Sequence, residues 1–82
     1  MAATTVNLAR QVLTLLIEKY EAPADTTETT SFELLGFDSL VLVEVSVDLK
    51  KKYSVEIGDD ELAEADNAAK TAELLTTKGV TV

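Results

Sequence analysis

The residues with the best-defined chemistry are Asp38 and Ser39, which lie side by side near mid-chain within Leu35-Gly36-Phe37-Asp38-Ser39-Leu40. A serine hydroxyl becomes a nucleophile only when a base removes its proton. The 82 residues include no histidine and no cysteine, which excludes Ser-His-Asp and Cys-His catalysis and the commonest zinc ligands. Covalent chemistry at Ser39 would therefore need a base from another protein; without it, the serine is a plain helix cap.

Acidic side chains also gather in the C-terminal half of the chain, at Asp59, Asp60, Glu61, Glu64 and Asp66. A calcium loop needs regularly alternating oxygen ligands, a central glycine and a final glutamate, and this spacing does not match that pattern. Acidic residues at helix N-termini interact favourably with the helix dipole. We therefore interpret this cluster as solvated helix starts and predict no metal site.

The net charge and composition of the chain restrict which kinds of molecule can be its binding partners. Seven basic and fifteen acidic residues give a net charge of −8, which disfavours nucleic acid and anionic membranes and favours a basic protein surface. No apolar run approaches the roughly 20 residues of a membrane span, and the N-terminus lacks a signal-peptide pattern. With 46% hydrophobic residues the chain is too apolar to be disordered. We predict one folded, monomeric, cytoplasmic domain over residues 1–82.

The first segment is the clearest helix, and Thr4 or Thr5 can cap its start. Its apolar residues recur at helical spacing, at Val6, Ala9, Leu13, Leu16 and Tyr20, with Leu8, Val12, Leu15 and Ile17 widening the stripe. So wide a stripe predicts burial by two or more neighbours. Pro23 and several threonines then predict a long loop over residues 21–38, anchored in the core by Phe32, Leu35 and Phe37.

Residues 38–53 fit two templates. The alternation of Val43, Val45, Val47 and Leu49 with polar residues is typical of a half-buried strand. A helical course is equally visible at Leu42, Val45, Leu49 and Tyr53. Asp38 or Ser39 can cap such a helix, and three lysines follow where its dipole favours cations. Because the chain offers no convincing partner strand, we predict a helix, on which Val41 is exposed.

The rest of the chain predicts two further helices. Gly58-Asp59-Asp60-Glu61 forms a turn that leads into one short helix. Asp66 or Asn67 can cap a last helix, which runs through Leu74 and Leu75 and ends at Gly79. The predicted fold class is therefore all-α: a small four-helix bundle, with three longer helices, one short helix and a long first loop.

The stretch Leu35–Leu40 resembles the prosthetic-group site of acyl carrier proteins, in which an Asp-Ser-Leu triplet opens the second helix. The triplet alone is weak evidence. Its setting also matches, because it follows a long loop and Leu-Gly, and Glu44 comes five residues after the serine. The segment from Lys52 to Glu61 is similar to the region between the family's second and third helices, and the resemblance runs from Leu8 to Leu75.

Within that family the sequence most resembles the discrete (type II) carriers of polyketide synthases, which tend to place an aromatic residue, here Phe37, before Asp-Ser-Leu. Three features depart from the family pattern. Lys50-Lys51-Lys52 replaces the acidic helix end usual in fatty-acid carriers, Ser54 replaces a frequent glycine, and Gly58 replaces a frequent proline. We interpret the lysines as a solvated helix end that complements the dipole, with a partner-specific docking patch as the alternative.

The resemblance implies the cofactor and the site residues. A phosphopantetheinyl transferase would attach 4′-phosphopantetheine from coenzyme A covalently to Ser39, with Asp38 and Leu40 beside it as cofactor-binding residues. A phosphodiester at a helix N-terminus meets unpaired N–H groups and the positive end of the dipole. Partner docking is implied for Leu40, Val43, Glu44 and Val47. The alternatives are simple solvation for Glu44 and a core position for the three apolar residues.

The function that the resemblance implies is that of a non-catalytic carrier, not an enzyme. It would tether acyl or polyketide intermediates as thioesters and shuttle them among the ketosynthase, acyltransferase and tailoring enzymes of a synthase. The pathway implied is polyketide (secondary metabolite, antibiotic) biosynthesis. A carrier for fatty-acid synthesis and an aminoacyl or peptidyl carrier are nearer alternatives. A non-catalytic acidic helical interaction module is an alternative from another class.

Overall fold

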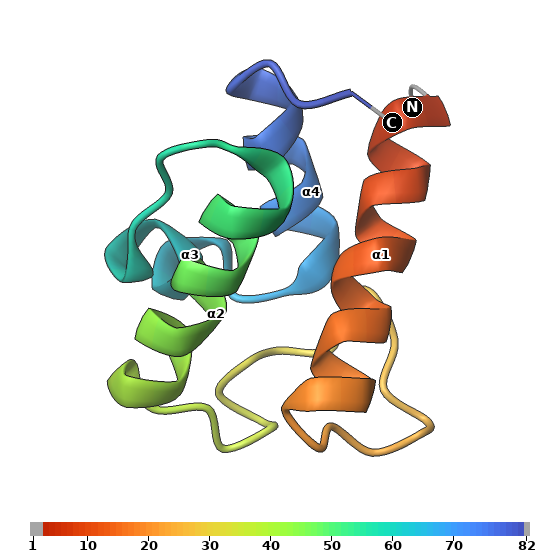
Figure 1. The fold of residues 1–82 in the computed structure, drawn as a ribbon. Coiled ribbons are helices and arrows are strands. Elements are labelled where there is room, and N and C mark those ends of the chain that lie inside the picture. The colour runs from red at the N-terminus through yellow and green to blue at the C-terminus, as the bar shows by residue number, and fades with distance from the viewer. Residues whose placement is uncertain (1–2, 82) are drawn as a thin grey trace.

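The computed structural model describes residues 3–81, so the outermost residues 1, 2 and 82 of the predicted domain lie outside the described part. Four helices follow one another along the chain: α1 (Ala3–Lys19), α2 (Ser39–Tyr53), α3 (Asp59–Ala65) and α4 (Ala68–Thr77) (Figure 1). No strand occurs in residues 3–81. The predicted all-α fold class, with three longer helices, one short helix and a long first loop, is confirmed.

Helix α1 packs along α4, and this pair brings the two ends of the described chain together (Figure 1). The face of α1 that is buried comprises Thr5, Leu8, Ala9, Val12 and Leu16. This face meets the buried residues of α4, which are Ala68, Thr71, Ala72 and Leu75. The prediction that Thr4 or Thr5 caps α1 is wrong. Both lie inside the helix, and Thr5 Oγ1 instead forms a hydrogen bond of 3.1 Å with Thr76 Oγ1 of α4.

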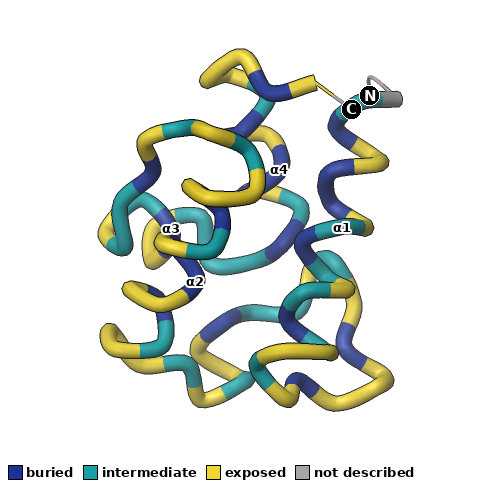
Figure 2. The backbone as a smooth tube through the Cα atoms, viewed as in Figure 1, coloured by how far each residue is buried: buried dark blue, intermediate teal, exposed yellow. Residues whose placement is uncertain are grey.

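Helix α2 confirms the helical reading of the valine-rich segment. Its buried residues are Leu42, Val45, Ser46 and Leu49, which recur at helical spacing. Buried and exposed segments accordingly alternate along the tube of α2 (Figure 2). The valine alternation therefore does not mark two faces of a strand. The expectation that Val41 is exposed is wrong, because Val41 is half-buried and packs against the core. The helix ends at Ser54, whose φ is +55° and whose N–H donates to the Lys50 carbonyl at 2.8 Å.

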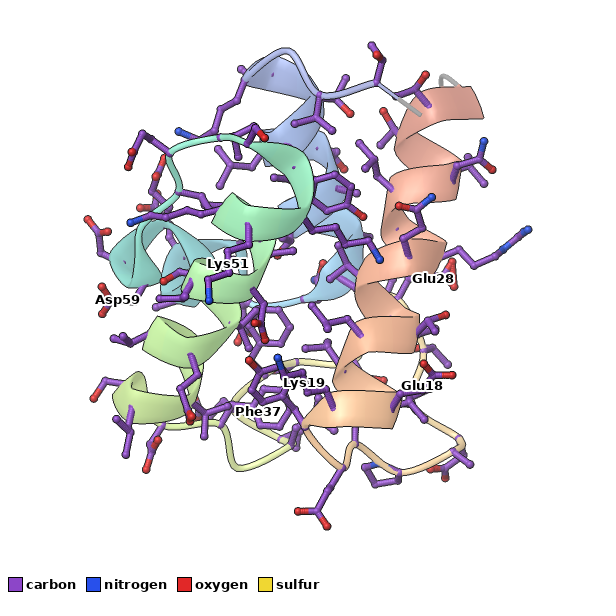
Figure 3. The ribbon with its side chains drawn as sticks, viewed as in Figure 1. Glu18, Lys19, Glu28, Phe37, Lys51 and Asp59 are labelled. Atoms are coloured by element: carbon purple, nitrogen blue, oxygen red, sulfur yellow. The ribbon has the colours of Figure 1, made fainter. Side chains whose placement is uncertain are left out.

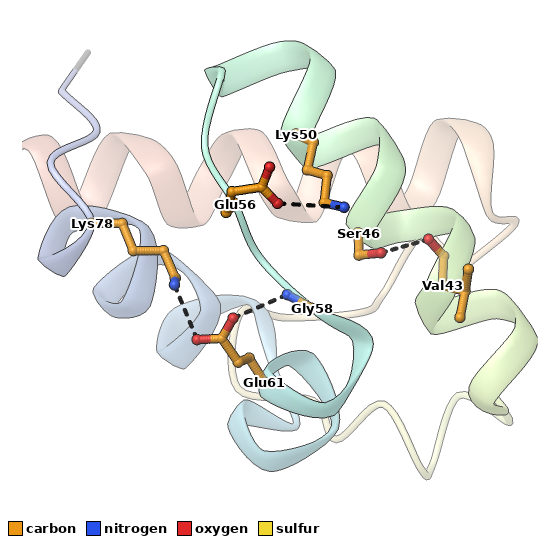
Figure 4. A network of polar contacts seen from close by, with 7 residues as sticks. All are labelled: Val43, Ser46, Lys50, Glu56, Gly58, Glu61 and Lys78. Carbon is orange, nitrogen blue, oxygen red and sulfur yellow. Dashed lines mark hydrogen bonds and ion pairs between the residues drawn. The ribbon is translucent and has the colours of Figure 1, made fainter.

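The start of α4 is found as predicted, whereas the turn predicted over residues 58–61 is partly wrong, because Asp59, Asp60 and Glu61 already form the first turn of α3. Gly58 precedes α3, and its N–H donates to Glu61 Oε1 at 3.0 Å, a bond that a proline at this position could not make (Figure 4). Glu61 also pairs with Lys78 beyond the end of α4, at 3.1 Å. Asn67, one of the two predicted caps of α4, accepts a hydrogen bond from the Lys70 N–H at 2.8 Å. Gly79 follows the last helix with a φ of +93°.

The loop between α1 and α2 is tied to the junction between α3 and α4 by three hydrogen bonds. The Phe32 N–H donates to the Asp66 carbonyl at 2.7 Å, and Ser31 Oγ donates to Asp66 Oδ2 at 2.7 Å. The Ala69 N–H donates to the Glu28 carbonyl at 2.9 Å. These bonds hold Phe32 in the core, so the long loop is fixed at its middle rather than only at its ends.

Helix α2 is held differently on its two sides. On one side it packs against α3, whereas no Cα atom of α1 lies within 8 Å of a Cα atom of α2. Two side-chain bridges cross the wider gap to α1. Tyr53 donates its hydroxyl hydrogen to Gln11 Oε1 at 2.6 Å, and Asp48 accepts hydrogen bonds from Tyr20 and Lys19. Helices α1 and α2 are therefore connected by these polar side chains as well as by the hydrophobic core that both helices contact.

Candidate functional site

Ser39 is the first residue of α2, and it is exposed. The preceding residue, Asp38, has an extended backbone (φ −87°, ψ −177°), and its carboxylate accepts the Val41 N–H at 3.0 Å. Asp38 is therefore the N-cap of the helix, which decides between the two caps that the sequence offered. Among residues 3–81, the Ser39 hydroxyl makes no hydrogen bond, so it is free to react.

The turn before Ser39 is built from backbone bonds and two aromatic rings. Gly36 has a φ of +75°, which favours glycine, and its N–H donates to the Glu33 carbonyl at 3.0 Å. The Phe37 N–H then donates to the Phe32 carbonyl at 3.0 Å. The Phe32 and Phe37 rings lie 6.0 Å apart at an angle of 32°. Because Phe32 is buried, its contacts fix the position of the turn that precedes Asp38 and Ser39. Figure 3 labels Phe37, the second ring of this turn. Phe32, Leu35 and Phe37 are confirmed as the loop's contacts with the core.

The predicted docking residues share the surface of α2 that begins beside Ser39. Leu40 is 68% exposed, and Val43 and Val47 are each 41% exposed. Glu44 is exposed as well, so none of the four residues belongs to the buried core. The sequence reading missed Leu34, which lies in the turn before Ser39 and is 83% exposed. The sequence carries no clear signal for this exposure, because Leu34 stands among Phe32, Leu35 and Phe37, which all contact the core.

Two hollows adjoin this surface. One, of about 310 Å³, lies between the turn, the start of α2 and α3, and is lined by Phe32, Glu33, Gly36, Phe37, Asp38, Leu42, Ala63 and Asp66. The other, of about 530 Å³, lies between the end of α1 and α2, with Tyr20, Val41, Val43 and Val47 among its lining residues. Asp48 stands at its edge. The hydrogen bond from Tyr20, and then Lys19, lowers the pKa of Asp48, whereas burial and Asp48 raise the pKa of Tyr20.

No group of three or more acidic side chains is placed to hold a metal ion within residues 3–81. No described helix is long and apolar enough to cross a membrane. Of the five acids interpreted as helix starts, Asp59, Asp60 and Glu61 occupy the first turn of α3. The interpretation is wrong for the other two, because Glu64 lies in the last turn of α3 and Asp66 caps its C-terminal end.

The fold and the site together define a small helical bundle that presents a free serine hydroxyl at the start of its second helix. A family model described as phosphopantetheine attachment site matches residues 10–75. The match covers most of the chain, so the chain belongs to this family of phosphopantetheine-carrying proteins. Comparisons with curated proteins and with solved structures gave no significant match.

The residues at the start of α2 fit the group that this family carries, which is covalently bound 4′-phosphopantetheine. The backbone N–H groups of Ser39 and Leu40 have no acceptor among residues 3–81, because they belong to the first turn of the helix. Two free N–H donors and the positive end of a 15-residue helix suit a phosphodiester. The Asp38 carboxylate accepts a hydrogen bond from the Val41 N–H and leaves these two donors open.

Proposed function

We propose that Ser39 is the attachment point of 4′-phosphopantetheine and that residues 1–82 form a single acyl carrier domain without catalytic activity of its own. The observation that carries this proposal is the free, exposed hydroxyl at the first residue of α2, in a chain of the phosphopantetheine-attachment family. The Ser39 oxygen would attack the pyrophosphate of coenzyme A, so that the phosphoester forms, the pyrophosphate P–O bond breaks and adenosine 3′,5′-bisphosphate leaves. The serine proton would pass to a base of the transferase, because the chain has no histidine. When bound, the group supplies a thiol that holds acyl cargo as thioesters.

The chain's own residues would orient and present this attachment point. Asp38 fixes the first turn of α2, and the buried Phe32 fixes the turn before it. Leu40, Val43, Glu44 and Val47 would dock the transferase and the enzymes of a synthase, with Leu34 as a further apolar contact. Exposed apolar side chains flanked by acids favour brief, electrostatically steered encounters, which suit a carrier that must release each partner.

We further propose that the synthase makes polyketides, with ketosynthase, acyltransferase and tailoring enzymes as partners of a monomeric, cytoplasmic carrier. Three sequence features support this choice over fatty-acid synthesis: Phe37 before the Asp-Ser-Leu triplet, the run Leu40-Val41-Leu42-Val43-Glu44, and the lysines at the end of α2. Loading assays that compare ketosynthases of polyketide and fatty-acid type would test it. Faster acyl transfer to the fatty-acid enzyme would contradict the polyketide assignment and leave the carrier function intact.

The attachment site is tested by intact mass spectrometry after incubation with coenzyme A, magnesium and a broad-specificity phosphopantetheinyl transferase. We expect one added phosphopantetheine on the wild-type chain and none on Ser39→Ala. Ser54→Gly is the matched control, because it removes an exposed hydroxyl at the opposite end of α2, where a φ of +55° accepts glycine. No addition to a wild-type chain shown to be folded by circular dichroism would overturn the proposal, and the interaction module would become the better hypothesis.

A further inference from the structure

Four of the seven basic residues lie along one seam between α1 and α2, on a chain with a net charge of −8. Arg10, Lys19 and Lys52 line a common hollow of about 500 Å³, in which Glu18 is the one carboxylate. Lys51 lies on the same face of α2 as Asp48, the partner of Lys19, because residues three positions apart are neighbours on a helix (Figure 3 labels Lys19 and Lys51). We call Arg10, Lys19, Lys51 and Lys52 the basic seam.

Most of the charge of the basic seam is not balanced within the described chain. Lys19 pairs with Asp48 at 2.9 Å, whereas Arg10, Lys51 and Lys52 form no ion pair among residues 3–81. Lys52 Nζ lies 5.9 Å from the centre of the Tyr53 ring, and Arg10, Lys51 and Lys52 are exposed. These cations are therefore available to an external anion.

The helix dipole accounts for only part of this arrangement. Lys51 and Lys52 occupy the last turn of α2, and Lys19 ends α1, where cations are favourable. Arg10 lies in the middle of α1, and the effect of a dipole fades beyond the last turn. Arg10 nevertheless lines the same hollow as Lys52, which comes from another helix 42 positions later in the sequence.

We propose that the basic seam binds an acidic segment of a partner protein. The hollow combines three cations with the half-buried side chain of Leu15 and the polar side chains of Gln11 and Thr14, which suits a peptide with carboxylates and aliphatic groups. Anionic membranes and nucleic acids fit less well, because the net charge of −8 repels an extended anionic surface. A short segment avoids most of that repulsion, because charges beyond about 10 Å are screened at physiological salt.

This inference deepens the proposed function by adding a second contact to partner docking. Along α2, Lys52 lies about 20 Å from Ser39, at 1.5 Å per helical residue. A partner that contacts Glu44 with basic groups and the basic seam with acidic groups would hold α2 in one direction. Reversing the carrier would place like charges together, so the two contacts would fix which way Ser39 points.

The test is a titration of ¹⁵N-labelled protein with the acetylated, amidated hexapeptide of glutamate, followed by NMR at low salt. We expect the largest shift changes at Arg10, Lys19, Lys51 and Lys52, and their disappearance at high salt. Lys51→Gln with Lys52→Gln should weaken binding about tenfold, the loss of two partly screened charge pairs. Lys70→Gln with Lys78→Gln changes the net charge equally and should leave binding within about twofold, since neither residue lies at the basic seam.

Arg10→Gln separates a two-helix site from a simple lysine-rich helix end. The inference expects a loss of about threefold to fivefold for this single change, because Arg10 contributes from α1. Unchanged binding in Arg10→Gln, or equal weakening in both lysine pairs, would overturn the proposal. Urea melts of every variant confirm that the chain remains folded before its affinity is compared.

Two other occupants are distinguished in the same experiment. Inorganic phosphate that moves the same signals with equal affinity would assign the basic seam to small anions. Shift changes at the seam on raising protein concentration alone, with slower diffusion, would assign it to a second copy of the chain. Either result overturns the acidic-segment proposal. Because the titration uses protein without its prosthetic group, its failure is distinct from failure of the mass-spectrometric test of Ser39.

Discussion

Asp38 and Ser39 have separate tasks: Asp38 caps α2, and Ser39 offers an unbonded hydroxyl. Asp38 holds the first turn of α2 through its bond to the Val41 N–H, and Ser39 keeps its hydroxyl free. If Ser39 were the cap, its oxygen would be engaged with a backbone N–H of the first turn. The division therefore lets the helix form independently of whether the serine is modified.

Replacing Asp38 tests this division at the scale of one residue. We expect Asp38→Ala to lower the free energy of unfolding by about 1 kcal/mol through loss of the cap. Asp38→Asn keeps a capping oxygen and should stay within about 0.5 kcal/mol of wild type. Urea melts measure both values, and transferase assays on the same proteins show whether the carboxylate charge is also recognised. Equal destabilisation by both changes would contradict a capping role.

A second prediction concerns Asp48 and acid stability. Its pKa lies below the ordinary value of 3.8, chiefly because Tyr20 donates a hydrogen bond to it and Lys19 pairs with it. A lowered folded-state pKa stabilises the fold above the unfolded value, and this contribution is lost as pH falls through the folded-state pKa. The difference in unfolding free energy between wild type and Asp48→Asn should therefore be largest near neutral pH and shrink below pH 3.8.

Urea melts at a series of pH values check the Asp48 prediction, and Tyr20→Phe provides the control. Without the tyrosine hydroxyl, the main cause of the lowered pKa is gone, so the pH dependence of the Asp48→Asn effect should weaken. An Asp48→Asn effect that is constant from neutral pH to about pH 2 would show that the carboxylate charge is not stabilising.

The sequence predicted that Asp38 or Ser39 caps α2 but not which of the two does so, and the reactivity of Ser39 stays a prediction. Aspartate and serine are nearly equal as caps, so composition cannot choose between them, and the backbone angles at Asp38 decide. At the start of α1 the same reasoning was wrong, because Thr5 bonds to Thr76, a residue 71 positions away. Tertiary contacts of this kind leave no local signal in the sequence.

At the scale of elements, α2 is the helix on which the proposed function depends, and one face of it anchors the molecule. Leu42, Val45 and Leu49 are buried, while Val43 and Val47, which we propose as docking residues, remain partly exposed. Of the three alternating valines, Val45 is therefore buried in the core, and Val43 and Val47 lie at the surface. A docking surface made from β-branched side chains is stiff, because valine has few side-chain rotamers in a helix.

Core substitutions test which face of each helix anchors the bundle. Leu49 is fully buried, and we expect Leu49→Ala to cost about 2–5 kcal/mol. Leu13 of α1, which the sequence placed on the apolar stripe, is only half-buried, so Leu13→Ala should cost clearly less. Equilibrium urea melts measure both. A larger loss for Leu13 than for Leu49 would contradict the assignment of the buried faces.

The local pattern did not by itself predict the helical nature of residues 39–53, and excluding the alternative was needed. Local pattern supported a strand and a helix equally, and the missing partner strand decided correctly for the helix. The exposure of Val41 was wrongly predicted because it depends on tertiary packing: Val41 packs against the core and lines the hollow between the end of α1 and α2. The short helix and its glycine start were predicted from a simple turn pattern.

At the scale of the whole molecule, the sign of the side-chain charges changes along α2, from negative near its start to positive at its end. The carboxylates of Asp38 and Glu44 lie in the first half of the helix, whereas Lys50, Lys51 and Lys52 lie in its last turn. Asp48 lies beyond the middle of α2, where it pairs with Lys19. Sequence alone showed both groups but could not show that Arg10 joins the lysines, because that meeting depends on how α1 and α2 pack. An acidic surface near Ser39 should speed encounter with a basic partner.

Salt provides the corresponding prediction. If acidic residues steer the transferase to Ser39, kcat/KM for modification should fall several-fold between about 20 mM and 500 mM sodium chloride, as screening shortens the range of the field. Steady-state assays at each salt concentration measure the fall, with kcat less affected than KM. A flat profile would show that Leu40, Val43 and Val47 dominate recognition instead.

The pairing of α1 with α4 has a practical consequence for attaching this protein to other objects. The start of α1 and the end of α4 meet through Thr5 and Thr76, at the end of the bundle away from the start of α2 (Figure 1). A linker to a bead, an electrode or a fused enzyme would leave the molecule there. Immobilised copies would therefore all present Ser39 to the solution, where partner enzymes can reach it.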